Sequence, residues 1–389
     1  MQIGLGAVVA STRACSNLAR PEALTPYPGS MSQHSASRAA APRASIVDVA
    51  ARAGVSPATV SRSLRGLGNV SPDTRERVLQ AARDLSYAAA SHDLAPIMAD
   101  RSVAVIVPFV SRWFFSTVTA AAADLLREQG YDVLLYHLGT AAARDRFFER
   151  MPLARRVAGI LTLSMPLTEE HTLALRALDM PLVSVGSSIP GSPSVGIDDV
   201  AAARGAVNHL INLKHRRIGL IVSEPDDDRF AFVSSLARRT GAQQALAAAG
   251  LPLDEEMVAS GPHGIEGGAT AMARLLARRR MPTAVFAEYD ELAIGALWTL
   301  RRAGLHVPRD MSVVSVDDHE MAVVLDLTTV AQSAAEQGTT AARMLIEVLE
   351  SGGAATGAPP VLLPERLVLR GSTAPYDPEA PDPSRNQPR

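Results

Sequence analysis

The segment from residue 56 to residue 62 carries side chains that suit contact with the edges of DNA bases. It reads Ser-Pro-Ala-Thr-Val-Ser-Arg, so small residues precede an arginine. The planar guanidinium of Arg62 can donate two parallel hydrogen bonds to guanine, while Pro57 and Ala58 offer apolar surface to thymine methyl groups. Polar side chains that could hold phosphates, and so fix register, are Ser45, Ser56, Thr59, Ser61 and Asn69. We therefore predict a DNA-reading surface here.

No residue spacing in the chain is typical of a catalytic centre. The sequence holds no nucleophile elbow, no phosphate-binding loop and no metal-binding pattern. Its nine histidines are scattered, and its single cysteine, Cys15, cannot form a thiolate zinc site. We expect no catalytic residue, no metal and no cofactor, and predict that the chain is not an enzyme.

Composition fits a soluble protein with more than one packed unit. The 389 residues are 47% hydrophobic and 20% charged, with a formal net charge of -2. This near-neutral balance excludes a protein that coats nucleic acid, but it allows a small reading head on a larger body. A lone cysteine suits a reducing compartment. The apolar run 3–10 is too short to span a membrane and lacks a basic flank, so a cytoplasmic location without membrane contact is predicted.

Three short helices are predicted to hold the DNA-reading residues. Ser45 with Asp48 forms a capping box for the first helix, and Gly54 suits its left-handed end. Ser56 followed by Pro57 starts the second helix, and the same signal at Ser71 starts the third. A glycine turn between the first two helices indicates a helix-turn-helix. The alternative is an ordinary small helical bundle whose surface helix happens to be well capped.

From residue 103 onward, strand and helix patterns alternate. Short apolar runs at the expected strands 103–108, 131–136, 157–163, 181–185, 217–222, 283–286 and 313–316 are separated by helical periods. Such alternation predicts parallel strands with right-handed crossovers and helices on both sheet faces. The length exceeds that of one comfortable sheet, so we predict an α/β fold of two doubly wound lobes. Ligands of such sheets bind at the carboxyl ends of the strands, which favours the cleft between the lobes.

Two sequence patterns reveal a family resemblance. Residues 48–62 read Asp-Val-Ala-x-x-Ala-Gly-Val-Ser-x-x-Thr-Val-Ser-Arg, and residues 70–78 read Val-Ser-Pro-x-Thr-Arg-Glu-Arg-Val. Together they closely resemble the headpiece of the LacI/GalR family of repressors. Further family-like stretches are residues 126–133, 205–210, 214–218, 245–253, 282–287, 307–314 and 327–332. The resemblance implies a periplasmic-binding-protein-like body, three chain crossings between its lobes, and a homodimer on a pseudo-palindromic operator.

These signals divide the chain into five expected segments. They are a disordered extension at 1–43, a helix-turn-helix domain at 44–86, a linker at 87–101, an effector-binding and dimerisation domain at 102–370, and a disordered tail at 371–389. Lobe one is expected at about 102–196 and 328–352, and lobe two at about 197–327 and 358–370. Met31 is an alternative to Met1 as the start of the protein.

The resemblance also places effector contacts on loops at the strand ends. Trp113, Phe114 and Phe115 align with cleft-lining aromatics of the family, although each phenylalanine could simply cover the sheet. Arg238 matches an arginine that grips effector hydroxyls or carboxylates, and its planar fork suits such contacts. Asp317 matches an effector-binding aspartate.

Three further effector contacts have structural alternatives of equal weight. Asp290 could instead cap a helix, and Tyr289, which stands where many relatives have asparagine, could be a wall residue, as could His263. Arg112 and Trp113 replace the family's usual asparagine and proline, which points to a ligand other than the commonest ones.

The linker departs from the family pattern. Relatives carry a hinge helix whose leucine enters the minor groove, but Asp93 and Pro96 occupy this segment. An acid repels phosphates, and a proline breaks a short helix. We therefore do not extend the resemblance to a hinge helix in the minor groove.

Taken together, the sequence predicts a DNA-binding transcriptional repressor that a small, sugar-like molecule controls allosterically. The rival interpretation is a solute-binding protein without DNA activity, which accounts for the lobes but leaves the helix-turn-helix unexplained. An enzyme on the same fold would need a catalytic constellation, which the sequence lacks.

Overall fold

The computed structural model describes residues 44–64, 70–85, 101–154, 156–224, 232–251, 253–351 and 359–378. Several predicted features lie outside these ranges, namely the extension at 1–43, Asn69, nearly all of the linker and the last eleven residues. Within the described ranges, no helix is long and apolar enough to cross a membrane.

Three helices form the DNA-reading head as predicted. They are α1 (Ile46–Ala53), α2 (Pro57–Leu64) and α3 (Pro72–Asp84). Ser45 begins α1 with a capping box, because its backbone N–H donates to Asp48 at 2.7 Å and its hydroxyl accepts from the Asp48 amide. Gly54 then adopts a φ of 69°, a left-handed conformation that glycine reaches without strain.

A small apolar core holds the three helices together. Val49, Val60 and Val78 supply one side chain from each helix, and all three have no exposed surface. Arg52 of α1 also lies 3.3 Å from Asp84 of α3. That pair is largely exposed and contributes little, so burial of the valines is the main stabilising term.

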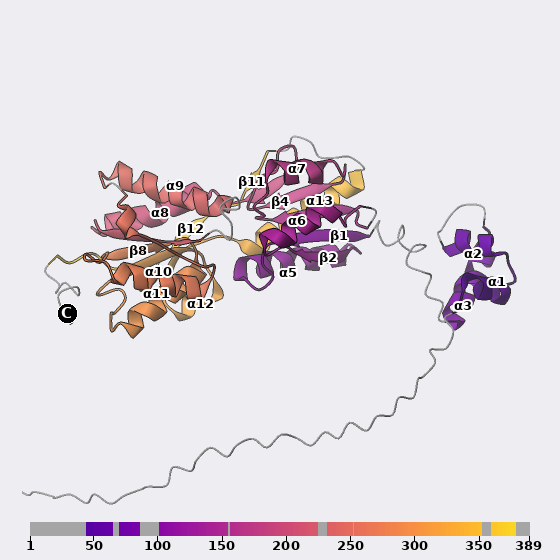
Figure 1. Ribbon diagram of the computed structural model, residues 1–389, viewed down its shortest axis with the longest axis horizontal. Coiled ribbons are helices and arrows are strands. Elements are labelled where there is room, and N and C mark those ends of the chain that lie inside the picture. Colours follow the sequence, from indigo (N-terminus) through magenta and orange to yellow (C-terminus); the bar gives the residue numbers. More distant parts are fainter. Residues whose placement is uncertain are drawn as a thin grey trace, which may run out of the picture. The chain divides into compact units, whose positions relative to one another are not determined.

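Lobe one is a parallel six-stranded sheet covered on both faces (Figure 1). Its strands, in sheet order, are β11 (Val361–Leu362), β5 (Ser194–Gly196), β4 (Leu182–Val185), β3 (Gly159–Leu163), β1 (Ser102–Val107) and β2 (Asp132–His137). One face packs against α5 (Trp113–Glu128) and α13 (Ala334–Ser351), and the other against α6 (Ala141–Arg150) and α7 (Glu169–Arg176). Because both faces are covered, its central strands are fully buried.

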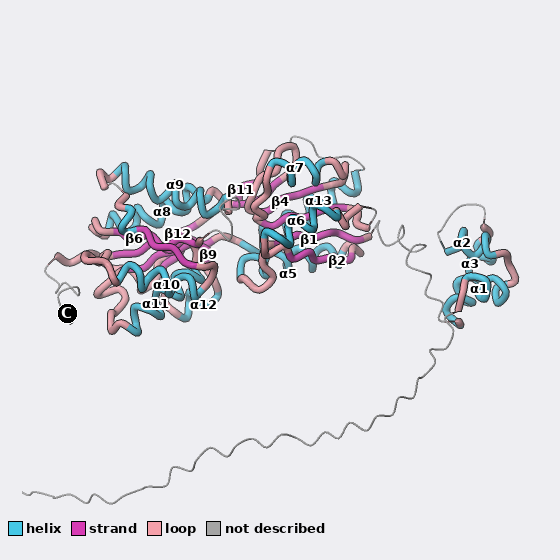
Figure 2. The backbone as a smooth tube through the Cα atoms, in the orientation of Figure 1, coloured by secondary structure: helices cyan, strands magenta, loops and turns pink. Residues whose placement is uncertain are grey.

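Lobe two repeats this architecture (Figure 2). Its strands, in sheet order, are β12 (Arg366–Val368), β10 (Thr328–Ala331), β9 (Ser312–Asp317), β8 (Ala284–Ala287), β6 (Ile218–Ser223) and β7 (Val258–Gly261). Only β12 runs antiparallel to its neighbour. Helices α8 (Asp199–Asn212) and α9 (Val233–Ala248) cover one face, while α10 (Ile265–Leu276), α11 (Asp290–Arg302) and α12 (Glu320–Val324) cover the other. A short 3-10 helix, η1 (Glu255–Met257), precedes β7.

The chain crosses between the lobes three times, after β5, after β10 and after β11. The expected lobe boundaries are wrong at two strands. Strand β10 was expected in lobe one but pairs with β9 in lobe two, and β11 was expected in lobe two but pairs with β5 in lobe one. Backbone pairing decides membership of a sheet, and strands of two to four residues are too short to reveal their partners through side-chain periodicity.

The expectation of a disordered tail from residue 371 is also wrong for its first residues. Ser372 is 2% exposed, and its hydroxyl accepts from the Thr328 amide at 2.8 Å and donates to the Val313 carbonyl at 2.6 Å. Further along, the amide of Tyr376 donates to the Leu213 carbonyl at 2.7 Å. The segment is ordered because it satisfies backbone groups of β9, β10 and the end of α8.

We predict that Ser372→Ala lowers the free energy of unfolding by about 1–3 kcal/mol, because the buried Thr328 amide and Val313 carbonyl each lose a hydrogen-bond partner. Urea unfolding followed by circular dichroism measures the change. The control is Ser116→Ala, which removes an exposed hydroxyl on α5. Equal stability of the two variants would show that the tail segment does not support the sheet.

Candidate functional site

A cavity that is open to solvent lies at the carboxyl ends of the strands of both lobes. Lobe one contributes residues after β1, β3 and β4, and lobe two contributes residues after β8 and β9 and from α9. This is the position that the parallel topology predicts, because the loops after neighbouring parallel strands gather at one edge of each sheet.

The structure brings six of the eight predicted effector residues to the cavity. The six that line it are Phe114, Phe115, Arg238, His263, Tyr289 and Asp317. Trp113 does not line the cavity and instead packs beside His319, with ring centroids 5.3 Å apart. Asp290 is fully buried elsewhere, where it accepts hydrogen bonds from Ser315, Thr329 and the His319 amide at 2.5–2.7 Å. Its alternative role as a helix cap is not seen either, because the N-cap of α11 is Tyr289.

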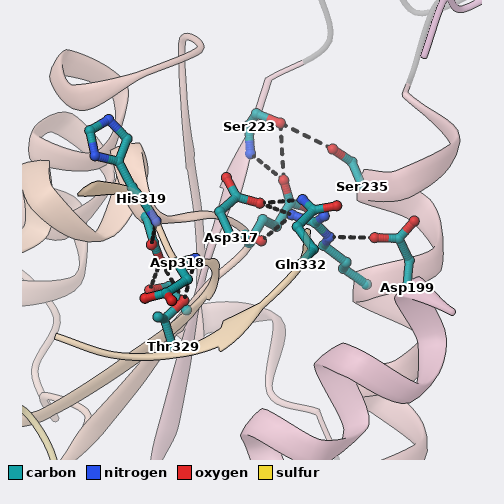
Figure 3. A network of polar contacts seen from close by, with 12 residues as sticks. Asp199, Ser223, Ser235, Asp317, Asp318, His319, Thr329 and Gln332 are labelled. Carbon is teal, nitrogen blue, oxygen red and sulfur yellow. Dashed lines mark hydrogen bonds and ion pairs between the residues drawn. The ribbon is translucent and has the colours of Figure 1, made fainter. Parts of the chain in front are cut away.

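Arg238 is the centre of the polar half of the cavity. Its Nε donates to Asp199 at 2.7 Å, and its Nη1 donates to the Glu288 carbonyl at 2.7 Å and lies 3.5 Å from Asp317 (Figure 3). The arginine reaches Asp199 because α9 lies close against α8. Gly241, one turn after Arg238, permits that approach, since a Cβ there would lie 2.2 Å from the Val200 carbonyl oxygen.

Asp317 ends β9 in a strained conformation, with a φ of 134°. Gln332 donates to its carboxylate at 2.6 Å (Figure 3). Gln337 in turn donates to Gln332 at 2.9 Å. Because Gln337 lies on α13 of lobe one, this chain of amides joins the two lobes. Burial raises the pKa of Asp317 to about 8, although the charge of Arg238 acts to lower it.

Glu288 lies behind Arg238 and was not predicted as a site residue. It is 2% exposed, and its carboxylate accepts from the amide and the hydroxyl of Ser223, both at 3.0 Å. The Ser223 hydroxyl is also 3.3 Å from that of Ser235, which lines the cavity. Burial raises the pKa of Glu288 to about 7. The available sequence signal was an acid two residues after the expected strand 283–286, which is directly after β8 as the structure has it.

Aromatic rings form the apolar half of the cavity. Phe109 lies 5.9 Å from Phe232 and 5.2 Å from His263, measured between ring centroids, and Phe115 lies 5.7 Å from Phe109. Sequence reasoning missed Phe109 and Phe232. Phe109 could have been found because it follows the first strand by two residues, whereas Phe232 precedes its helix without a strand signal.

Arg112 connects the lobes at the same cavity. Its Nη2 donates to the His263 carbonyl at 2.6 Å, and its Nη1 lies 4.0 Å from the carboxylate of Glu291. Arg112 precedes α5 in lobe one, and both partners belong to lobe two. Neither Arg112 nor Glu291 was among the predicted effector contacts, although both line the cavity.

On the reading head, the three predicted base-contacting residues Pro57, Ala58 and Arg62 are exposed on α2. Ser56 caps this helix, since its hydroxyl accepts from the Thr59 amide at 3.2 Å, and the two hydroxyls lie 2.9 Å apart. The predicted phosphate contacts Ser45 and Ser56 are exposed, while Thr59 and Ser61 are half-buried.

Comparison with known proteins places the head and the body in one family. The family model for bacterial regulatory proteins of the lacI family matches residues 45–89, and that for a periplasmic binding protein-like domain matches residues 207–373. The transcriptional repressor CytR of Escherichia coli K12 is 33% identical over 341 residues, covering 85% of this chain and 96% of CytR.

Two solved structures are similar over the same span. A lac repressor dimer bound to operator and the anti-inducer ONPF matches with a TM-score of 0.66 and 28% identity, covering 85% of this chain and 99% of that one. A complex of the transcriptional regulator CelR with cellobiose matches with a TM-score of 0.63 and 30% identity, covering 85% of this chain and all of that one.

We predict that Glu288→Gln becomes more stable, relative to the parent protein, as the pH rises. The carboxyl has an ordinary pKa near 4.5 when unfolded and about 7 when folded, so the parent loses stability as the pH rises through this window. The difference has an upper limit of about 3 kcal/mol. Urea midpoints at pH 5, 6, 7 and 8 measure it, with Glu256→Gln, an exposed site on η1, as the control. Parallel curves for the parent and Glu288→Gln would contradict the assignment.

Proposed function

The chain belongs to the LacI family of bacterial regulatory proteins, and we propose that it is a repressor whose operator affinity is set by a small molecule in the inter-lobe cavity. One observation carries this proposal above all: an exposed DNA-reading helix and a charged cavity between two lobes occur in a single chain. A solute-binding protein would have no use for the first feature, so we set that rival aside.

Helix α2 is the element that enters the major groove. Its small exposed residues Pro57 and Ala58 allow a close approach to thymine methyl groups, and Arg62 reads guanine. Backbone phosphates are held by hydroxyls at the helix starts, for which Ser45, Ser56, Thr59 and Ser61 are the described candidates. Asn69, outside the described residues, completes the proposed set.

The chain acts as a homodimer on a pseudo-palindromic operator. The similar lac repressor structure is a dimer on operator DNA, and a twofold protein requires two half-sites. The head is small, so two heads on one DNA site supply affinity that one lacks. Because its target is the chromosome, we place the protein in the cytoplasm and assign it no catalytic role.

The effector is sugar-like. The similar CelR structure contains cellobiose. The cavity of this chain combines aromatic residues with hydrogen-bonding groups, which is the combination that binds sugars. Phe114 and Phe115 give the cavity an apolar wall for the apolar side of a pyranose, while Arg238 and Asp317 meet its hydroxyls. His263 and Tyr289 complete the proposed contacts, whereas Trp113 and Asp290, away from the cavity, act only by supporting its walls.

Arg62→Ala should weaken operator binding by about 1–3 kcal/mol, the usual worth of a bidentate arginine–guanine contact. Operator DNA is first selected from a random duplex pool by the full-length protein, and affinity is then measured by fluorescence anisotropy at fixed salt. Arg279→Ala, an exposed arginine in lobe two, is the matched control. Unchanged affinity in Arg62→Ala would remove Arg62 from the base-reading surface.

A panel of pentoses, hexoses, disaccharides and nucleosides should contain a ligand that raises the melting temperature and changes operator affinity. For that ligand we expect Arg238→Lys to weaken binding at least about tenfold, because lysine keeps the charge but loses the planar fork. Arg239→Lys is the matched control, since Arg239 faces solvent and pairs with Glu255. Equal binding by both variants, measured by calorimetry, would move the effector away from the cavity.

A further inference from the structure

The arginines that line the cavity are already paired with acids. Arg238 contacts Asp199 at 2.7 Å and Asp317 at 3.5 Å, and Arg112 lies 4.0 Å from Glu291. Within the described lining, three carboxyl groups therefore face two guanidinium groups. The buried Glu288 adds a fourth acid directly behind Arg238. Asp199 and Glu291 alone match the charge of the two guanidinium groups. No surplus of positive charge is therefore left for a ligand even when Asp317, whose pKa burial raises to about 8, holds a proton.

This balance determines which ligands can enter at low cost. A phosphate or carboxylate would lose its hydration beside a group of acids, and it would have to take a guanidinium from a carboxylate that already holds it. A neutral hydroxyl or amide group has no such cost, because it can both donate to Asp199 or Asp317 and accept from Arg238. The charge distribution of the pocket therefore disfavours the binding of anionic ligands.

Building on the proposed effector site, we propose that the effector carries no anionic group. It is uncharged or positively charged, with hydrogen-bonding groups toward Arg238 and Asp317 and an apolar or planar face toward Phe109, Phe115 and Phe232. Phosphorylated and carboxylated relatives of the same molecule are excluded by charge, even where their size fits the cavity.

Matched ligand pairs test this inference on the full-length protein at pH 7.4. The probes are ribose with ribose 5-phosphate, glucose with glucosamine, glucuronate and glucose 6-phosphate, cellobiose with cellobionate, and adenosine with its monophosphate. Calorimetry measures affinity, and operator binding by the same sample is recorded in parallel. We expect each uncharged or cationic ligand that binds to do so at least about tenfold more tightly than its anionic counterpart.

Two results would overturn the proposal. One is an anionic probe that binds as tightly as its neutral partner, and the other is a panel in which no uncharged or cationic probe binds. Whether the protein binds operator DNA is measured independently of either result, so the proposed DNA-binding role is tested separately. A sample that binds neither operator nor any probe would contradict the proposed function itself.

A second inference rests on a different observation, the bridge that Arg112 makes across the cleft. Its guanidinium lies directly against Gly264, where a Cβ would come within 1.8 Å of Nη1. Glu291, 14% exposed, faces Arg112. Burial raises the pKa of Glu291, while Arg112 and the Trp113 backbone at the start of α5 act to lower it. A lobe-two carboxylate therefore lies at the N-terminus of a lobe-one helix, where negative charge is favoured.

We infer that Arg112, Gly264 and Glu291 form a latch that holds the two lobes together in the absence of effector. The latch is specific to this arrangement of residues. The Arg112 side chain is long enough to cross the cleft, Gly264 leaves space for its guanidinium, and Glu291 supplies the opposite charge. Weakening the latch widens the distribution of lobe angles and so changes operator affinity without any effector.

Intramolecular fluorescence transfer between dyes at Arg127→Cys in lobe one and Arg279→Cys in lobe two tests the latch, in a Cys15→Ser background. We expect Arg112→Met to broaden the efficiency distribution and to change effector-free operator affinity at least about threefold. Gly264→Ala should cause the same two changes, because the added methyl group displaces the guanidinium of Arg112 while the arginine keeps its charge. Arg150→Met, an exposed arginine at the end of α6, is the control. An unchanged distribution in Arg112→Met overturns the latch, whatever Gly264→Ala does.

Discussion

The structure of the cleft follows from one buried charge, the guanidinium of Arg238. A guanidinium keeps its proton under all physiological conditions, so burying it requires negative charge and hydrogen-bond acceptors from the surrounding elements. Helix α8 supplies Asp199, and strand β9 supplies Asp317 through an unfavourable backbone conformation. Glu288, the residue directly after strand β8, supplies its carbonyl. Arg238 therefore contacts three elements of lobe two, and these elements together form the floor of the cavity.

The same requirement connects lobe two to lobe one. Asp317 accepts from Gln332, which accepts in turn from Gln337 on α13, so the acid that balances Arg238 begins a chain of amides that ends in the other lobe. A ligand that takes a hydrogen bond from Arg238 or gives one to Asp317 changes the first link of this chain. Such a ligand contacts a network that spans both lobes, which is the physical condition for converting occupancy into a change of lobe angle.

The parts of this arrangement that are local in sequence could be predicted, and those that depend on tertiary contacts could not. Capping at Ser45 and Ser71 fixed the helix starts of the head, because a cap needs only the next three residues. Trp113 was misplaced because it is the first residue of α5, and successive helical residues point about 100° apart, so Trp113 and its two phenylalanine neighbours cannot all face the cavity. Resemblance found Arg238, but the Glu288 carboxylate is held by Ser223, sixty-five positions away, and no local pattern reports that contact.

The energy of the Arg112 bridge is of the same order as the coupling it would have to control. Allosteric coupling between an effector and a DNA site is typically about 1–3 kcal/mol. A hydrogen bond from a charged group contributes about 1.5–3 kcal/mol, and the partly exposed Arg112–Glu291 pair adds at most about 1 kcal/mol after solvent screening. A contact of that energy across the cleft is large enough to change the equilibrium between open and closed arrangements of the two lobes.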